Sequence, residues 1–444
     1  MPDLEQTGAT GASALPGRAA DSFIPAPGPR RRFRAPGTFR ALGYSGFRFL
    51  WTGQLGHSAA MWMEQVVRPL LILELTGSAL QVGLVISVRM IPQLVFGLLA
   101  GVIADRYNKR RVLMLSQTMT LLMHLTLGLL IVTGRIEIWQ VFVTAFISGA
   151  SMAFNQPARQ SLVPRLVPPD MLLNALALNT AAMNIMRVFG ASLAGLLLLF
   201  MDYGQIYLLN AALFAGVIWT TANIRELGDG EAGKRSEQVK TKRSTSILGD
   251  FSEGFRYILT NRRVLYLVAL ALLLFVLGQP YQQVFIPLIA LDVLSIGRSG
   301  AGLLLALTGV GALVGSLVMA SAKTLSHRGP IMMGFLVVFG LSLVLLSQST
   351  WLPLSGVALI LAGAMTTTYN ALNTSLLLEQ SPQALHGRVM SLMSLDRGLV
   401  SVGAILSGGL AQALGAQSGL AVVAGACAIL TVLVFLLVPS LRKI

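Results

Sequence analysis

Long apolar runs follow one another along most of this chain and constrain its fold more than any other feature. The hydrocarbon core of a bilayer is about 30 Å thick, and a helix crosses it with roughly 20 residues. Twelve such runs can be read, at residues 49–74, 79–103, 112–133, 138–154, 173–200, 205–223, 264–290, 299–322, 330–348, 351–375, 388–413 and 417–439. Because lipid offers the backbone no hydrogen-bond partners, the runs are predicted to be helices. The predicted fold class is therefore all-α and integral to the membrane, with about 12 transmembrane helices.

Composition excludes the main alternatives. Charged residues make up 11% of the chain, against roughly a quarter in a soluble domain. A transmembrane barrel would show alternation with a period of two, and runs such as 196–200 and 303–307 show none. The single cysteine, Cys427, lies in the last apolar run and rules out an intramolecular disulfide.

Basic residues mark one side of the predicted bundle. With the N-terminus inside, 27 of the 33 Lys and Arg fall in the tails or in the loops on the same side. Because cytoplasmic loops are enriched in Lys and Arg, both termini are predicted to be cytoplasmic. This topology also explains the net charge of +15, so no nucleic-acid partner is expected.

The two halves of the chain echo each other around a polar stretch at residues 225–250. Three sets of positions repeat at offsets of 213 to 215: Gly97 and Gly101 with Gly311 and Gly315, Phe154-Asn155 with Tyr369-Asn370, and Gly190 and Gly195 with Gly403 and Gly408. One near-constant offset indicates an internal duplication, hence two pseudo-symmetric six-helix lobes. The expected organisation is a disordered cytoplasmic tail at 1–45, lobes at 46–224 and 263–444, and a cytoplasmic connector at 225–262.

The loop between the second and third runs carries the most specific motif. Residues 101–111 read GVIADRYNKRR and resemble the signature G-x-x-x-D-R-x-G-R-R of the major facilitator superfamily, with Asn108 where Gly is usual. Asn tolerates the left-handed backbone conformation that Gly supplies in such a turn. Gly101, Asp105, Arg106 and Arg110 are therefore expected to form a cytoplasmic gate loop. The alternative is a plain positive-inside anchor.

Two further segments narrow the resemblance. Residues 75–83 (LTGSALQVG) and 154–167 (FNQPARQSLVPRLV) look like the branch that contains the enterobactin exporter. The resemblance implies an inner-membrane exporter of siderophores, antibiotics or other small amphiphiles, driven by a proton gradient. A solute importer or uniporter of the same fold, and a lipid flippase or membrane scaffold, remain alternatives.

The first run carries a polar stripe. Gln54, His57, Met61, Glu64 or Gln65, and Arg68 recur at spacings of three and four, which places them on one helix face. Glu64 precedes Arg68 by four residues, the favourable order for an ion pair. One interpretation is a cavity-lining helix in which Glu64 carries the proton; the other is a structural pair that faces a neighbouring helix.

Other ionisable residues inside the runs are functional hypotheses because charges in lipid are costly. Asp396 is the second proton-coupling candidate; it adjoins Arg397, so the two point to different faces, and Arg89 and Arg187 are possible partners. His124 is expected to be structural. The candidates for lining the cavity or binding substrate are His57, Met61, Trp62, Gln65, Arg68, Arg89, Arg187, Tyr281, Gln282, Tyr369, Asn370 and Arg397.

Signals of enzymatic or metal chemistry are missing from the sequence. The four His residues are scattered without metal-ligand spacing, and no phosphate-binding Gly-x-x-x-x-Gly-Lys-Ser/Thr loop exists. No metal, cofactor or enzymatic activity is expected. The expected partners are a small-molecule substrate, protons and the bilayer, and the expected state is a monomer.

Overall fold

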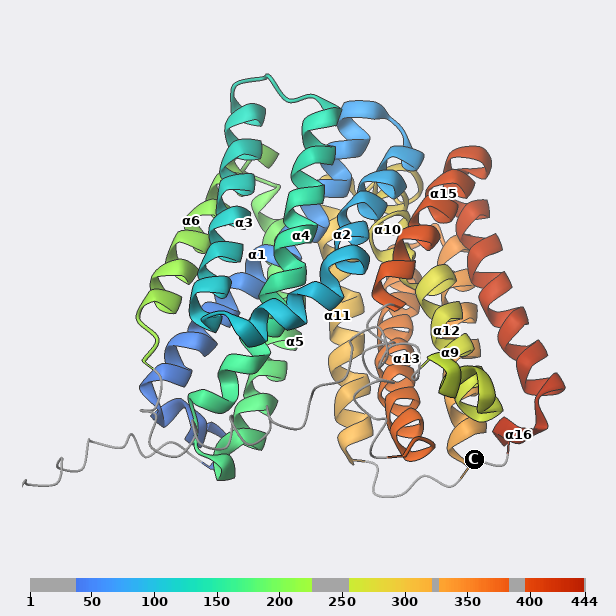
Figure 1. Ribbon diagram of the computed structural model, residues 1–444. Helices are drawn as coiled ribbons and strands as arrows, with labels where there is room; N and C mark the ends of the chain where they lie inside the picture. Colours follow the sequence, from blue (N-terminus) through green and yellow to red (C-terminus); the bar gives the residue numbers. More distant parts are fainter. Residues whose placement is uncertain (1–36, 226–254, 322–326, 383–395, 443–444) are drawn as a thin grey trace, which may run out of the picture. The chain divides into compact units, whose positions relative to one another are not determined.

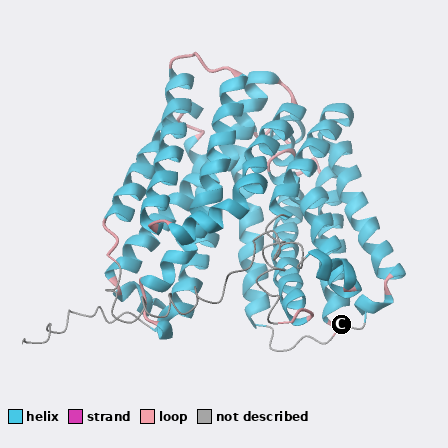
Figure 2. Ribbon diagram, viewed as in Figure 1, coloured by secondary structure: helices cyan, strands magenta, loops and turns pink. Residues whose placement is uncertain are grey.

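Every regular element in the described part of the chain is helical, and Figure 2 shows no strand there. The computed structural model describes residues 37–225, 255–321, 327–382 and 396–442, without the side chains of 37–38, 98–106 and 396–397. Residues 35–444 form one compact unit. The predicted all-α membrane fold is confirmed.

The N-terminal lobe contains six long helices (Figure 1). They are α1 (Ser45–Thr76), α2 (Ala79–Arg106), α3 (Lys109–Val132), α4 (Ile138–Leu162), α5 (Leu172–Leu197) and α6 (Tyr203–Ala222). A short 3₁₀ helix, η1 (Gly37–Gly43), precedes them, and Ala41 within it is fully buried and donates its amide to Asn174 Oδ1 at 3.0 Å. The tail expected to lack structure up to residue 45 is therefore helical from Gly37 onward.

The C-terminal lobe begins with an interrupted span. It comprises α9 (Arg262–Leu273), a π-helical turn η4 (Leu274–Gly278), a 3₁₀ turn η5 (Gln279–Gln282), α10 (Phe285–Leu288) and a second π turn η6 (Ile289–Val293). Pro280 lies in η5, where its missing N–H and its ring prevent a continuous α-helix. The rest of the lobe consists of α11 (Gly297–Ser321), α12 (Arg328–Gln348), α13 (Leu352–Glu379), α15 (Asp396–Leu437) and α16 (Pro439–Arg442).

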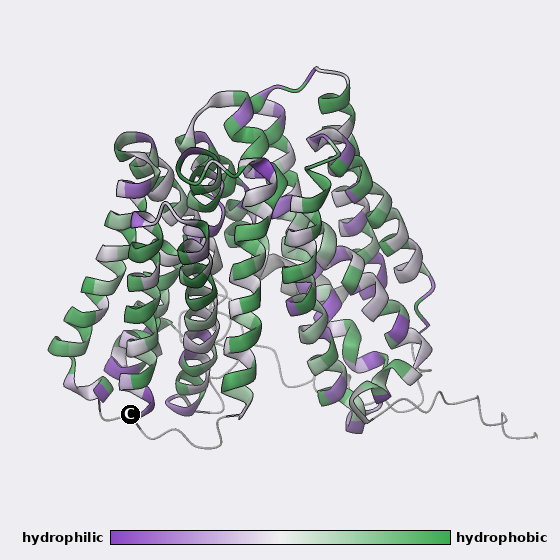
Figure 3. Ribbon diagram, turned by 180° about the vertical axis from the view of Figure 1, so that it is seen from behind, coloured by the Kyte–Doolittle hydropathy of each residue, from purple (hydrophilic) through white to green (hydrophobic). Residues whose placement is uncertain are grey.

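Within the described residues, ten helical segments are long and apolar enough to cross a membrane. Two features explain why twelve crossings were predicted and ten segments are found. Helix α1 has 32 residues but carries the polar stripe, and it is not among the ten. Helix α15 reverses direction at Gly415, where φ is 83°, so this one segment contains two predicted crossings (Figure 1). Figure 3 shows polar residues gathered at loops and helix ends and mainly apolar residues between them.

Two of the repeated glycine pairs, Gly190 with Gly403 and Gly195 with Gly408, occupy matching places in the two lobes. A Cβ at Gly190 would overlap α1, the first span, and a Cβ at Gly403 would overlap η4 in the seventh. In the same way Gly195 packs against α11 and Gly408 against α2. Small residues allow such close helix crossings. These two pairs therefore repeat helix-crossing points, whereas a Cβ would meet no atom within 4 Å at Gly97 but would overlap Ile360 at its counterpart Gly311.

The lobes meet along two helix pairs, α2 with α15 and α5 with α11. Their close approaches lie toward the end of the bundle where α1 ends and α2 begins, which we call the outer end. There Gly195 meets Gly302, and the Ala79 amide donates to Gln412 Oε1 at 3.0 Å. The opposite end, where α1 begins and α6 ends, is the inner end.

Candidate functional site

Glu64 of α1 is the centre of a charged cluster inside the N-terminal lobe. Its side chain is 3% exposed. Oε1 accepts a hydrogen bond from Arg68 Nη2, one helical turn away, and Oε2 accepts one from Arg89 Nη2 of α2 at 3.2 Å. His124 Nε2 of α3 lies 3.9 Å from Oε2. One carboxylate thus holds together three helices of the lobe.

Local structure explains how these groups meet. The Glu64–Arg68 pair follows from the four-residue spacing on one helix. Arg89 is brought near because Gly149 of α4 lets that helix approach the Arg89 carbonyl so closely that a Cβ would overlap it. His124 Nδ1 donates to the Thr120 carbonyl at 2.8 Å, so Nε2 is the ring nitrogen that faces Glu64.

A small polar cavity adjoins the cluster. The volume open to the centre of a water molecule is about 20 Å³, which is enough for one water. Side chains of helices α1, α2, α3, α4 and α6 line the cavity. His57 and His124 both contact Phe214, with ring centroids 5.4 and 5.3 Å away. The polar stripe of α1 therefore faces the interior of its own lobe at His57, Met61 and Glu64. There Glu64 contacts side chains of its own helix and of α2 and α3.

The cluster can bind or release a proton only by rearranging. Protonation of Glu64 would leave the guanidinium groups of Arg68 and Arg89 buried without a counter-charge, which is costly in a low-dielectric interior. A movement that separates one arginine from Glu64 would remove that obstacle. No group of His, Cys, Asp and Glu in the described residues could hold a metal ion.

A second charged group lies where the lobes face each other. The Arg187 guanidinium of α5 stacks over the Trp62 ring of α1, with its carbon 5.0 Å from the ring centroid. Tyr281, in the interrupted seventh span of the other lobe, is 1% exposed, and its ring centroid lies 5.8 Å from that of Phe339. The structure thus brings two of the predicted cavity residues, Arg187 and Trp62, into contact.

Of the remaining predicted residues, Gln282 donates a hydrogen bond to the Tyr281 hydroxyl at 3.3 Å. Tyr369 and Gln282 are buried, and Gln65 and Asn370 are half-buried. The side chains of Asp396 and Arg397 lie outside the described residues, as do those of Gly101, Asp105 and Arg106 in the predicted gate loop.

The described part of the gate loop joins two helices of one lobe. Arg110 donates to the carbonyls of Ala222 and Ile224, at the C-terminal end of α6, where a cation is favourable. Asn108 has φ −62° rather than the left-handed conformation expected for it. Its side chain instead caps α3, accepting from the amides of Arg110 at 3.1 Å and Arg111 at 3.2 Å.

Two groups that have no functional role in the sequence-based prediction lie at notable positions in the structure. His124 was expected to be structural, yet its Nε2 faces Glu64; the nearest signal was its unusual polarity in an apolar run. Glu74 at the end of α1 pairs with Arg298 of α11 at 2.6 Å, and Arg298 also lies 4.9 Å from the Tyr203 ring centroid. This pair joins the two lobes at the outer end.

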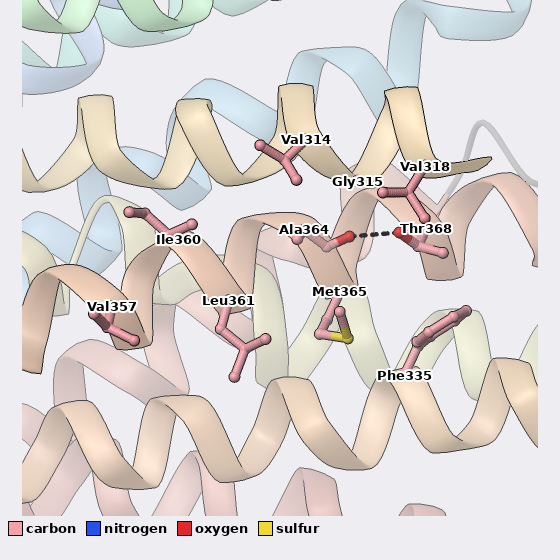
Figure 4. A pocket seen from close by; sticks show the side chains of 10 residues that line it. All are labelled: Val314, Gly315, Val318, Phe335, Val357, Ile360, Leu361, Ala364, Met365 and Thr368. Atoms are coloured by element: carbon pink, nitrogen blue, oxygen red, sulfur yellow. Dashed lines mark hydrogen bonds between the residues drawn. The ribbon is translucent and has the colours of Figure 1, made fainter. Parts of the chain in front are cut away.

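An apolar groove of about 400 Å³ lies between α11, α12 and α13 (Figure 4). Val318 and Val357 on its rim are 60% and 61% exposed, so it opens at the protein surface. Its one hydroxyl, on Thr368, donates to the Ala364 carbonyl at 2.7 Å and is thereby satisfied. The groove is suited to hydrocarbon and offers no polar group for recognition.

Comparison with known protein families identifies the fold. The sequence profile described as transmembrane secretion effector matches residues 36–444, nearly the whole chain. The chain belongs to this family. Transmembrane secretion effectors are efflux-type transporters of the major facilitator superfamily, so the predicted superfamily is confirmed and the chain is a multi-pass membrane transporter and not an enzyme.

Curated relatives of this chain have low sequence identity to it but align over most of its length. Macrolide efflux protein A of Streptococcus pyogenes is 23% identical over 83% of this chain and 90% of its own length. Multidrug efflux pump Tap of Mycolicibacterium fortuitum is 26% identical over 79% and 85%, and the staphyloferrin A transporter of Staphylococcus aureus is 22% identical over 78% and 84%.

Solved structures share the fold of this secretion effector at low identity. The nucleoside transporter NupG aligns with a TM-score of 0.72 at 13% identity, over 88% of this chain and 98% of its own. A bacterial homologue of the human lysosomal transporter Spinster, in an inward-facing and unoccupied conformation, aligns with a TM-score of 0.68 at 13% identity, over 91% and 96%.

Proposed function

We propose that this chain exports a small amphiphilic molecule by alternating access, in exchange for protons, across the plasma membrane. The family and the names of the efflux relatives support export. The observation that carries proton coupling is the buried Glu64, held by Arg68 and Arg89 with His124 Nε2 3.9 Å away. Since one chain contains both lobes, we propose that it works as a monomer.

The proposed orientation has both termini in the cytoplasm. Five arginines lie toward the inner end, as the positive-inside rule requires of a cytoplasmic face. They are Arg110, Arg111, Arg262, Arg263 and Arg442. The contacts between the lobes gather at the outer end, so the structure corresponds to a state closed to the outside. An exporter in that state is ready to receive its cargo from the cytoplasm.

In the proposed cycle Glu64 is ionised in this closed-outside state and takes up a proton when the lobes rock. Rocking would separate Arg89 or Arg68 from the carboxylate, and protonation would then no longer leave the same ion network unbalanced. The water-sized cavity beside His124 supplies a place for the proton to pass. Asp396 remains a second proposed proton site.

The test is transport in liposomes under an imposed pH gradient. Purified protein would be reconstituted and uphill movement of amphiphilic dyes, fluorescein among them, and of siderophores followed, with and without a protonophore. We expect Glu64→Gln to abolish uphill movement, because the glutamine cannot exchange a proton at this position. Glu379→Gln is the matched control, since Glu379 is exposed and pairs with Arg328 at 2.8 Å within the other lobe.

Further variants separate a transport defect from a folding defect. Removing the only acid of the cluster leaves two buried arginines unpaired, so Glu64→Asp, which keeps the charge, would be studied in parallel. Asp396→Asn tests the second proton site. Downhill movement that neither the protonophore nor these variants alter would contradict antiport and favour a uniporter of the same fold.

A further inference from the structure

At the junction of the lobes, Arg187 lies over the Trp62 ring and forms no ion pair with a described residue. Arg187 has no acidic partner among the described residues, and its Nε is buried without a hydrogen bond. Trp62 Nε1, on the ring over which Arg187 stacks, is also buried without a partner. Two hydrogen-bond donors and a formal charge are therefore unsatisfied at one place.

The other charged side chains nearby add to the excess of positive charge. In the middle of helices α1–α6, the described charged side chains are three arginines, Arg68, Arg89 and Arg187, and one acid, Glu64. Glu64 is already shared between Arg68 and Arg89. An unpaired charge within the span of a membrane protein is costly and marks a functional site by default.

The chemistry of these groups specifies a ligand. A guanidinium is a planar fork that binds a carboxylate or similar oxyanion through two parallel hydrogen bonds. The Trp62 indole N–H adds a donor, and the Trp62 ring offers an apolar surface to the rest of the molecule. A cationic cargo would meet repulsion here and gain no acid.

We propose that Arg187 and Trp62 form the recognition site for a carboxylate-bearing aromatic amphiphile, the cargo of the exporter. The inference rests on the transport function proposed above and names the class of its substrate. Arg187 binds the carboxylate, and the Trp62 ring contacts the apolar part.

Equilibrium binding in detergent tests the site without transport. The probes are fluorescein, which carries a carboxylate, and fluorescein methyl ester, in which that carboxylate is blocked. We expect the wild type to prefer the free acid by about tenfold or more, the effect of a charge-assisted hydrogen bond. Arg187→Gln should remove this preference by weakening binding of the acid and leaving that of the ester within about twofold.

Two further variants make the result decisive. Arg187→Lys keeps the charge but loses the fork, so it should retain only part of the preference. Arg135→Gln removes an exposed arginine from a loop and should bind as the wild type does. Should Arg187→Gln not fold, Trp62→Phe, which removes the indole donor, must lower the affinity for the acid selectively.

The outcomes distinguish this inference from the proposed function. Equal binding of acid and ester by the wild type, equal loss of both in Arg187→Gln, or no binding of either probe overturns the carboxylate site. Selective binding of the acid together with failure to move any dye in liposomes upholds the site and refutes the export mechanism instead.

Discussion

At the scale of single residues, the position of His124 Nε2 beside Glu64 leads to a specific prediction. His124→Asn preserves a donor for the Thr120 carbonyl, since the asparagine amide can take the place of Nδ1–H, but removes the titratable nitrogen that faces Glu64. We expect uphill transport driven by a pH gradient to fall about a hundredfold or more, the range of a positioned proton-transfer group, while downhill movement persists. Transport in liposomes with and without the gradient measures both.

His327→Asn is the control for that variant. His327 is exposed at the start of α12 with φ 59°, a conformation that Asn tolerates well. Its transport should equal that of the wild type. Full coupling to the pH gradient in His124→Asn would contradict a role of His124 in proton transfer. His124 would then have the structural role predicted from the sequence.

At the scale of helices, close crossings at glycine position the charged cluster. A Cβ on Gly149 would overlap the Arg89 carbonyl, so Gly149→Ala must force α4 away from α2. We expect a loss of stability of about 1–3 kcal/mol, typical of overpacking, and weaker coupling because Arg89 moves relative to Glu64. The melting temperature in detergent and the liposome assay measure the two effects.

Gly216→Ala provides the matched comparison on α6. A Cβ there would meet no atom within 4 Å, and alanine favours helix over glycine by up to about 1 kcal/mol. Its melting temperature should stay equal or rise. Similar losses in both variants would mean that helix propensity or folding yield, and not the crossing, sets the effect.

At the scale of the whole molecule, the Glu74–Arg298 pair helps to close the outer end. The side chains are 48% and 45% exposed, so solvent limits the contribution of the pair to about 0.2–1 kcal/mol. Glu74→Gln should therefore raise the ratio of open to closed molecules at the outer end by only about 1.4-fold to 5-fold. The swap Glu74→Arg with Arg298→Glu should restore the original fraction.

Single-molecule energy transfer can follow this opening. Dyes on cysteines at Arg135 and Thr350, exposed in outer loops of the two lobes, report the distance between them; the one native thiol, Cys427, is buried and would be replaced by serine. Glu379→Gln removes a comparable surface pair inside one lobe and should leave the distribution unchanged. An unaltered distribution in Glu74→Gln would show that backbone packing alone closes this end.

Much of the fold was accessible from the sequence because the bilayer restricts what a chain can do. Apolar runs in lipid must become helices, so the all-α class and the spans could be predicted from composition and residue type. The glycine repeats and residues 101–111 indicated two lobes and the superfamily. Of the charged cluster, only the Glu64–Arg68 pair was predictable, because it depends on spacing within one helix.

The tertiary structure alone decided what the other charged groups meet. Arg89 and His124 reach Glu64 from different helices, and Arg187 lies over Trp62 where the sequence suggested Asp396 as its partner. Periodicity defines the faces of a helix but not which neighbour each face meets. That choice depends on which small residues permit close crossings, such as Gly149 at Arg89 and Gly195 at Gly302, and these contacts form only when the helices pack.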